Sequence, residues 1–354
     1  MERPKRFRPF CFLLFERIER KMRIVIPMAG MGKRLRPHTL VTPKPLVRIA
    51  EKPIVQRLVE DIVSIQTEKV EEIAFVIGRF GKEVENHLIA LAEQLGAKGT
   101  IHYQDQALGT AHAIMCAESA LQGPVTVAFA DTLFRADFKL DPSADGVLWV
   151  KKIEDPRQFG VVELNSAGTI VSFQEKPQEF VSDLAMIGIY YFKDGEWLKR
   201  ELQYLLDNNI MNGGEYQLPD AMRNMMKQGA KFVPGEVDEW MDCGNKNAVV
   251  ETMASVVSRL PQNHNVQLEG DSKIIEPCYF GSNVIIQDST VGPNVSIASN
   301  VSIVNSKLEN SSVDANCKIE NAQLTNSMID EYCQVSGIKG VLDLGSYNTI
   351  QNND

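Results

Sequence analysis

The apolar positions in the first third of the chain follow two alternating patterns. Short continuous apolar runs have the length of buried strands and cover residues 24–28, 73–77, 101–104 and 125–130. Between them, apolar residues recur at helical spacing after Pro53, over residues 84–95, where Gly96 provides a stop, and over residues 110–121. Strands that alternate with helices predict a largely parallel sheet covered on both faces. Ligands bind such sheets at the carboxyl ends of the strands.

The pattern changes after residue 145, where strand-like runs follow one another directly. Strands are predicted over residues 146–152, 160–164, 169–175 and 185–192, with a hairpin turn over 165–168. The run at residues 235–241 indicates one more strand, and helices are expected over residues 196–206, 218–227 and 247–260. We therefore expect one α/β domain over residues 22–260, with a mostly parallel but mixed sheet.

The last part of the chain loses helical periodicity and keeps a shorter repeat. An aliphatic residue recurs at every fifth or sixth position, and Asn and Ser, which suit tight turns, fill the intervals. The repeated positions are Ile285, Val291, Ile297, Ile303, Leu308, Val313, Ile319, Leu324, Ile329 and Val335. A disordered Asn/Ser-rich tail is the alternative, but it would not keep this spacing. The repeat is typical of a left-handed parallel β-helix of the hexapeptide type. We expect it over residues 266–354, after a linker at 261–265.

Residues 1–21 differ from the rest, because they are basic and contain only a short apolar run. They lack the long apolar core and small-residue cleavage site of a signal peptide. We interpret them as a disordered N-terminal tail, or Met22 as the natural start.

Composition excludes several classes of protein. The formal charge of −9 argues against a general affinity for nucleic acid, so any polyanion site must be a local basic cluster. No apolar run approaches the length of a membrane span. The six cysteines include no C-x-x-C pair, which favours reduced thiols in the cytoplasm over a disulfide framework or a zinc site.

The first predicted strand opens into a loop suited to bind an anion. Ala29, Gly30 and Gly32 allow backbone N–H groups to approach it, and Arg34 and Lys44 follow as cations. An ordinary strand and turn with basic surface residues remains the alternative for the glycines alone.

A longer string narrows the choice. Residues 30–46 resemble the signature of the sugar-1-phosphate nucleotidyltransferases, G-x-G-x-R-L-x-P-x-T followed by P-K-P-L, although Ala29 stands where many members have glycine. The resemblance implies a Rossmann-like nucleotidyltransferase domain. It also implies that Arg34 faces the β- and γ-phosphates of a nucleoside triphosphate, and that Lys44 bridges its α-phosphate and the sugar phosphate.

Later motifs match the same family in order and spacing. Asp131, and Asp242 in the W-x-D-x-G motif at residues 240–244, match the two carboxylates that hold the catalytic Mg²⁺. Taken without the family, each Asp would be read as a cap or turn residue.

The resemblance also assigns the two substrates. Glu175 and Lys176 in the E-K-P motif, with Gly160, match the sugar-phosphate site. Gln104 and Gly109 match the base-reading segment, where the Gln amide would pair with the N3–H and a carbonyl of thymine or uracil. His112 is expected to serve helix packing rather than metal binding.

The chain is therefore expected to be a magnesium-dependent enzyme that resembles the long glucose-1-phosphate thymidylyltransferases. It would transfer a nucleotidyl group from dTTP or UTP to a sugar 1-phosphate, with glucose 1-phosphate as the expected sugar. Guanylyl- and adenylyltransferases are alternatives, as is a non-catalytic subunit that senses nucleotide sugars. We expect small-molecule substrates, no nucleic-acid or membrane partner, and a homo-oligomer. No acetyltransferase activity is expected of the β-helix, because bifunctional relatives use a histidine there and these repeats contain none.

Overall fold

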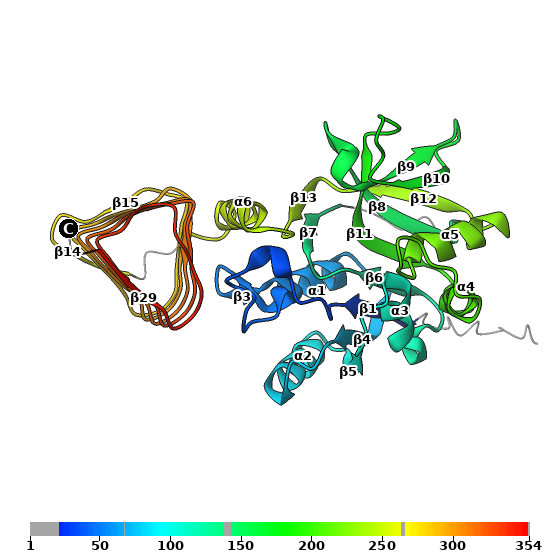
Figure 1. Ribbon diagram of the computed structural model, residues 1–354, viewed down its shortest axis with the longest axis horizontal. Coiled ribbons are helices and arrows are strands. Elements are labelled where there is room, and N and C mark those ends of the chain that lie inside the picture. Colours follow the sequence, from blue (N-terminus) through cyan, green and yellow to red (C-terminus); the bar gives the residue numbers. More distant parts are fainter. Residues whose placement is uncertain (1–20, 67, 138–142, 263–265, 353–354) are drawn as a thin grey trace, which may run out of the picture.

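The computed structural model describes residues 21–66, 68–137, 143–262 and 266–352. It consists of an α/β body and a triangular β-helix, with one helix, α6 (Lys246–Val257), between them (Figure 1). The tail expected at residues 1–21 lies outside the described residues except for Lys21, which begins the first strand. Most of the expected linker, residues 263–265, also lies outside them.

The body is built on a nine-stranded mixed sheet with the order β10-β9-β11-β6-β1-β4-β5, in which β8 pairs with β11 and β12. Its first four strands are mutually parallel: β1 (Lys21–Pro27), β4 (Lys69–Ile77), β5 (Lys98–Tyr103) and β6 (Val125–Ala128). The others are β8 (Gly146–Lys152), β9 (Gly160–Leu164), β10 (Ile170–Glu175), β11 (Leu184–Phe192) and β12 (Phe232–Glu236). Strand β11 runs antiparallel to β6, β8 and β9.

Helices cover both faces of this sheet because alternate residues of its central strands point to opposite sides. On β1, Ile24 and Ile26 join one buried cluster, and Val25 joins the other. The first cluster includes α1 (Ile54–Ile65), α2 (Lys82–Gln94) and α6, and the second includes α3 (Thr110–Cys116), α4 (Gly195–Asp207) and α5 (Leu218–Lys227). Helix α3 is shorter than expected, because the chain passes through Ala117 into a 3-10 turn, η3 (Glu118–Ala120). Gly96 adopts a φ of 78° just after α2, as expected for a helix stop.

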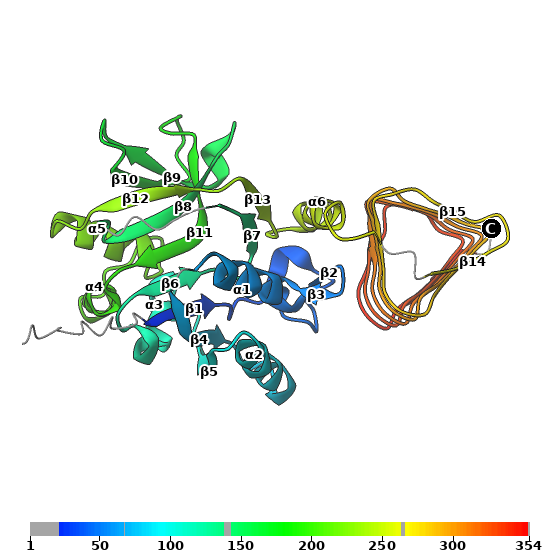
Figure 2. The same ribbon diagram turned by 180° about the vertical axis from the view of Figure 1, so that it is seen from behind.

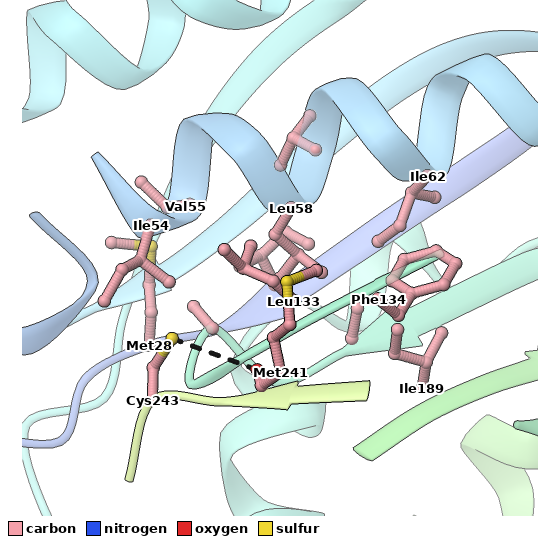
Figure 3. Packing of buried hydrophobic residues seen from close by; sticks show 14 of the residues in the cluster. Met28, Ile54, Val55, Leu58, Ile62, Leu133, Phe134, Ile189, Met241 and Cys243 are labelled. Carbon is pink, nitrogen blue, oxygen red and sulfur yellow. Dashed lines mark hydrogen bonds between the residues drawn. The ribbon is translucent and has the colours of Figure 1, made fainter. Parts of the chain in front are cut away.

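The strand predicted over residues 235–241 is wrong, since this run contributes to two different sheets. Strand β12 ends at Glu236 in the main sheet, and β13 (Glu239–Asp242) pairs antiparallel with β7 (Thr132–Arg135). The N–H of Asp238 donates to the carbonyl of Arg135 at 2.8 Å and thereby starts the second pairing. This β7–β13 ribbon packs under α1, where Leu133, Phe134 and Met241 meet Ile54 and Leu58 (Figure 3).

The β-helix has three parallel sheets of six, five and five strands. The first contains β14 (Val266–Glu269), β17 (Val284–Gln287), β20 (Ser302–Val304), β23 (Lys318–Glu320), β26 (Gln334–Ser336) and β29 (Thr349–Gln351). The second contains β15 (Lys273–Ile274), β18 (Thr290–Val291), β21 (Lys307–Glu309), β24 (Gln323–Thr325) and β27 (Lys339–Gly340). The third contains β16 (Cys278–Phe280), β19 (Val295–Ile297), β22 (Ser311–Val313), β25 (Met328–Ile329) and β28 (Asp343–Leu344). The predicted fold class is thus confirmed: a Rossmann-like α/β body with a mostly parallel mixed sheet, followed by a left-handed β-helix.

The repeated aliphatic positions line the β-helix core, with one correction. Ile285 is 37% exposed, whereas its neighbour Ile286 is fully buried. The corners explain this register, because Asn283 turns the chain with a φ of 56° and leaves Val284 and Ile286 facing inward. Asparagine adopts this left-handed conformation more readily than most residues. Stacked corner asparagines are also hydrogen-bonded, as from Asn294 Nδ2 to Asn310 Oδ1 at 2.8 Å.

The third β-helix sheet faces the body across α6 and the segment that contains residues 37–51 (Figures 1 and 2). His38 Nδ1 lies 2.8 Å from Asp330 Oδ1, and Glu51 accepts hydrogen bonds from Tyr279 at 2.8 Å and Ser299 Oγ at 2.7 Å. Burial alone would raise the pKa of Glu51, but the hydrogen bonds from Ser299 and Tyr279 outweigh it and lower that pKa. The two parts are therefore joined by specific polar contacts.

Two further findings bear on the expectations from composition. Among the described residues, the cysteines Cys116, Cys243, Cys278, Cys317 and Cys333 are free thiols. No helix in the described ranges is both long and apolar enough to cross a membrane.

Candidate active site

A cavity of about 340 Å³ lies at the carboxyl ends of the central strands, beside the glycine loop. Predicted site residues from four separate segments line it together: Ala29, Gly30, Gly32, Lys44, Gln104, Gly109 and Asp131. Arg34, Gly160, Glu175, Lys176 and Asp242 are not part of its lining. The cavity thus unites the glycine loop and the predicted base-reading segment.

The glycine loop is held in shape by its own signature residues. Gly32 has a φ of 62°, and a Cβ atom there would lie 2.5 Å from Cβ of Lys44. Thr39 Oγ1 donates a 2.7 Å hydrogen bond to the carbonyl of Gly32. The Lys44 side chain is only 10% exposed, and its Nζ lies 3.0 Å from Asp131 Oδ2. This packing explains why Lys44, on the 3-10 turn η2 (Lys44–Leu46), faces the carboxylate rather than solvent.

Asp131 and Asp242 are brought together by the β7–β13 ribbon. Asp131 immediately precedes β7 instead of ending β6, and its carbonyl accepts a 2.9 Å hydrogen bond from the N–H of Cys243. Trp240 supports the ribbon through a 2.6 Å hydrogen bond from its Nε1 to Thr132 Oγ1.

The electrostatics of this pair favour a bound cation. Burial raises the pKa of Asp242, and the charge of Asp131 raises it further, against a hydrogen bond from Gly244 and the charges of Lys44 and Arg34. The described residues contain no cluster of three or more His, Cys, Asp and Glu that could hold a metal alone. Two carboxylates completed by phosphate oxygens and water are, however, the donor set that Mg²⁺ prefers in phosphoryl-transfer sites. The residues present therefore fit Mg²⁺ bound together with a nucleotide.

The second group of predicted residues gathers at the end of the β9–β10 hairpin. Gly160 pairs with Glu175, and a Cβ atom on Gly160 would lie 2.8 Å from a Glu175 carboxylate oxygen. Lys176 follows with a φ of 46°, and its N–H donates to the carbonyl of Phe159 at 3.1 Å. The ring of Phe159 meets Trp240 edge to face at 4.7 Å, which connects this hairpin to the ribbon that carries Asp242.

Tyr190 was missed by sequence reasoning and lies between the two groups. Burial raises its pKa strongly, and the charges of Glu175 and Asp131 add to this effect. Its ring packs edge to face on Phe129, a residue of the cavity lining, at 6.2 Å. A buried aromatic residue in an apolar strand gives no sequence signal of this position.

Gln104 and Gly109 occupy the other end of the cavity. The Gln104 backbone N–H donates to the carbonyl of Ile77 at 2.9 Å, which holds the residue at the sheet edge. Gly109 has a φ of 110°, and a Cβ atom there would lie 2.4 Å from the carbonyl oxygen of Tyr216. Thr110, Ala113 and Glu215 also line the cavity. Thr110 and Ala113 follow closely on the predicted Gly109, whereas no sequence motif points to Glu215.

Comparisons with known proteins agree with this arrangement. The family model described as nucleotidyl transferase matches residues 24–259. A glucose-1-phosphate thymidylyltransferase of Streptomyces antibioticus is 27% identical over 317 residues, which are 82% of this chain and 86% of the relative. The catalytic subunit beta of mannose-1-phosphate guanylyltransferase of Drosophila pseudoobscura pseudoobscura is 30% identical over 284 residues, 78% of this chain and 72% of the relative. The bifunctional protein GlmU of Methanocaldococcus jannaschii is 28% identical over 276 residues, 76% of this chain and 61% of the relative.

Proposed function

The chain belongs to the nucleotidyl transferase family, as a sugar-1-phosphate nucleotidyltransferase, and we propose that it joins thymidine or uridine triphosphate to a sugar 1-phosphate. A phosphate oxygen of the sugar 1-phosphate attacks the α-phosphorus of the nucleoside triphosphate. The bond between this phosphorus and the oxygen that bridges to the β-phosphate breaks, and pyrophosphate leaves. The observation that carries the proposal is Lys44 Nζ at 3.0 Å from Asp131, at the edge of the cavity and beside Asp242.

The residues would supply charge and position rather than a nucleophile. The attacking phosphate is already an anion, so no general base is needed, and positioning with charge neutralisation supplies the rate. Lys44 would stabilise charge on the α-phosphate, and Arg34, exposed on η1 (Lys33–Leu35), would turn toward the leaving pyrophosphate. Asp131 and Asp242 would hold Mg²⁺, which neutralises phosphate charge when bound.

The sugar phosphate would bind on the β9–β10 side. Glu175 would accept hydrogen bonds from sugar hydroxyls, and Lys176 would contact the phosphate. Gly160 leaves the space that the Glu175 carboxylate occupies. Glucose 1-phosphate is the sugar we propose, because the thymidylyltransferase relative carries that name and aligns over most of both chains.

Two alternatives make different predictions. The guanylyltransferase relative, at 30% identity, favours GTP with mannose 1-phosphate as the second candidate. A regulatory subunit without catalysis would be expected to lack the charged residues, whereas this chain keeps Arg34, Lys44, Asp131, Lys176 and Asp242.

The test is pyrophosphate release from a matrix of dTTP, UTP, GTP, ATP and CTP against glucose, mannose and amino-sugar 1-phosphates. We expect turnover with dTTP or UTP and glucose 1-phosphate in Mg²⁺, and none without the metal. Highest kcat/KM with GTP and mannose 1-phosphate would replace the pyrimidine proposal. Nucleotide binding without pyrophosphate release for any pair would favour the regulatory subunit.

A further inference from the structure

A backbone carbonyl determines which way the side-chain amide of Gln104 is turned. Its terminal atom lies 3.2 Å from the carbonyl oxygen of Gly109. A carbonyl oxygen can only accept a hydrogen bond, so the Gln104 atom that faces it is the nitrogen, Nε2. The close packing of Gly109 under Tyr216 keeps this carbonyl in place.

A second acceptor faces the same nitrogen. His112 Nδ1, on α3, lies 3.1 Å from Gln104 Nε2. The amide nitrogen of Gln104 donates hydrogen bonds and does not accept them, so His112 Nδ1 must be the acceptor. The imidazole of His112 is therefore neutral and carries its proton on the other ring nitrogen, His112 Nε2. Burial lowers the pKa of His112 and so favours the neutral ring.

Both amide hydrogens of Gln104 are therefore used inside the protein. In the described part of the chain, its Oε1 has no hydrogen-bond partner, and Gln104 lines the cavity. With both hydrogens used in this way, the amide would not also donate to a carbonyl of the base. Only an acceptor is left for the base.

We propose that His112 is a positioning residue that, with the Gly109 carbonyl, fixes Gln104 as a hydrogen-bond acceptor, so that the pocket selects bases with an N–H on their pairing edge. The inference rests on the proposed function, since it takes the cavity as the nucleotide site. Thymine and uracil present N3–H and guanine presents N1–H. Cytosine N3 and adenine N1 carry no proton and would place a lone pair against Oε1. The fixed acceptor thus favours UTP over CTP and GTP over ATP.

The experiment compares His112→Leu, which removes the acceptor, with His112→Asn, whose Oδ1 can occupy the place of Nδ1. His112→Phe is the second acceptor-free variant if His112→Leu fails to fold, as judged by Tm. Affinities for UTP and CTP are measured by calorimetry with Mg²⁺, and kcat/KM is measured separately with glucose 1-phosphate. In the acceptor-free variant we expect the UTP:CTP ratio to fall about tenfold, mainly through weaker UTP binding, since one hydrogen bond is worth roughly that factor. His112→Asn should restore most of the ratio.

The outcomes separate the two claims. A UTP:CTP ratio within twofold of wild type in a folded acceptor-free variant would overturn the role of His112, as would a wild-type preference for CTP or ATP. If the binding ratio falls as expected but no sugar phosphate supports turnover, the positioning role stands and the proposed reaction fails.

Discussion

At the scale of single residues, the position of the Lys44 side chain depends on Gly32, which has no side chain of its own. Its Cβ occupies the space that a Cβ on Gly32 would need, and this contact directs the ammonium toward Asp131. Gly30 is different, since a Cβ there would meet nothing within 4 Å. Both glycines line the cavity, but only Gly32 is also needed for the packing of Lys44.

Gly32→Ala should lower both Tm and kcat. The new Cβ collides with Lys44, and the left-handed φ costs a non-glycine residue about 1–2 kcal/mol. Gly30→Ala is the matched control, for which we expect an unchanged Tm and a raised KM for the nucleotide. Thermal unfolding and steady-state kinetics of both variants check this. Wild-type Tm and kcat in Gly32→Ala would contradict the proposed packing of Lys44.

Asp131→Asn and Asp242→Asn should each nearly abolish turnover without unfolding the protein. Each removes one of the two carboxylates proposed to hold Mg²⁺. Burial raises the pKa of Asp242, so its charge is unfavourable in the fold, and Asp242→Asn should not lower Tm at neutral pH. Asp271→Asn, an exposed change on the β-helix, is the control. Near-normal kcat of either site variant at saturating Mg²⁺ would remove that residue from the metal site.

At the scale of elements, α1 carries an ionisable group in an unfavourable place. Burial raises the pKa of Asp61 to about 6, although Arg57 and Arg135 oppose this shift. The folded protein therefore prefers the neutral carboxyl. Its contribution to stability is fully present below the unfolded pKa near 3.8 and is lost as pH rises through about 6.

Asp61→Asn should consequently become more stable than wild type as pH rises. We expect the difference in free energy of unfolding to grow by about 1–3 kcal/mol between pH 4 and pH 7, from the size of the shift. Urea unfolding at several pH values measures it. Glu93→Gln, an exposed change on α2, should show no such trend. Parallel pH curves for Asp61→Asn and wild type would show that Asp61 is solvated.

The same scale shows what the sequence could predict. The sequence predicts strands and helices correctly where a single hydrophobic periodicity continues, because burial of one face of an element imposes that periodicity. The sequence does not predict the break between β12 and β13, because the two residues there, Val237 and Asp238, are neither glycine nor proline. Two adjacent isoleucines, Ile285 and Ile286, fit the repeat equally well, and only the corner at Asn283 decides between them.

The candidate site could be predicted as a list of residues but not as a set of contacts. Arg34, Lys44 and the two aspartates stand in recognisable motifs. The role inferred for His112 and the position of Tyr190 depend on what meets these residues across the fold. His112 matters because Gly109 presents a carbonyl to the same amide nitrogen, and no spacing in the chain encodes that.

At the scale of the whole molecule, the β-helix is attached to the body through residues of the signature loop region. His38 follows Arg36 and Pro37 in the signature and meets Asp330 at 2.8 Å. Lys246 of α6 pairs with Asp343 at 3.2 Å on the same side. The β-helix therefore contacts the segment that directly follows the glycine loop.

We predict that the β-helix has no acetyltransferase activity of its own. Residues 266–354 contain no histidine to act as a base, although one group of relatives is named bifunctional. Acetyl-CoA consumption with an amino-sugar phosphate should equal the rate without enzyme. The Asp131→Asn variant serves as the control that separates any such activity from nucleotidyl transfer. Consumption above background in that variant would contradict the prediction.

The contact between His38 and Asp330 has a consequence for protein engineering. The two parts look like separable modules joined by one helix, which invites exchange of the β-helix between homologues. Because the segment that carries His38 contacts the third sheet of the β-helix, a chimera would also replace the β-helix side of this contact. A donor β-helix would have to bring a carboxylate opposite His38 and partners equivalent to Tyr279 and Ser299 for Glu51. A working chimera would therefore have to exchange the contact residues on both sides of the junction together with the β-helix.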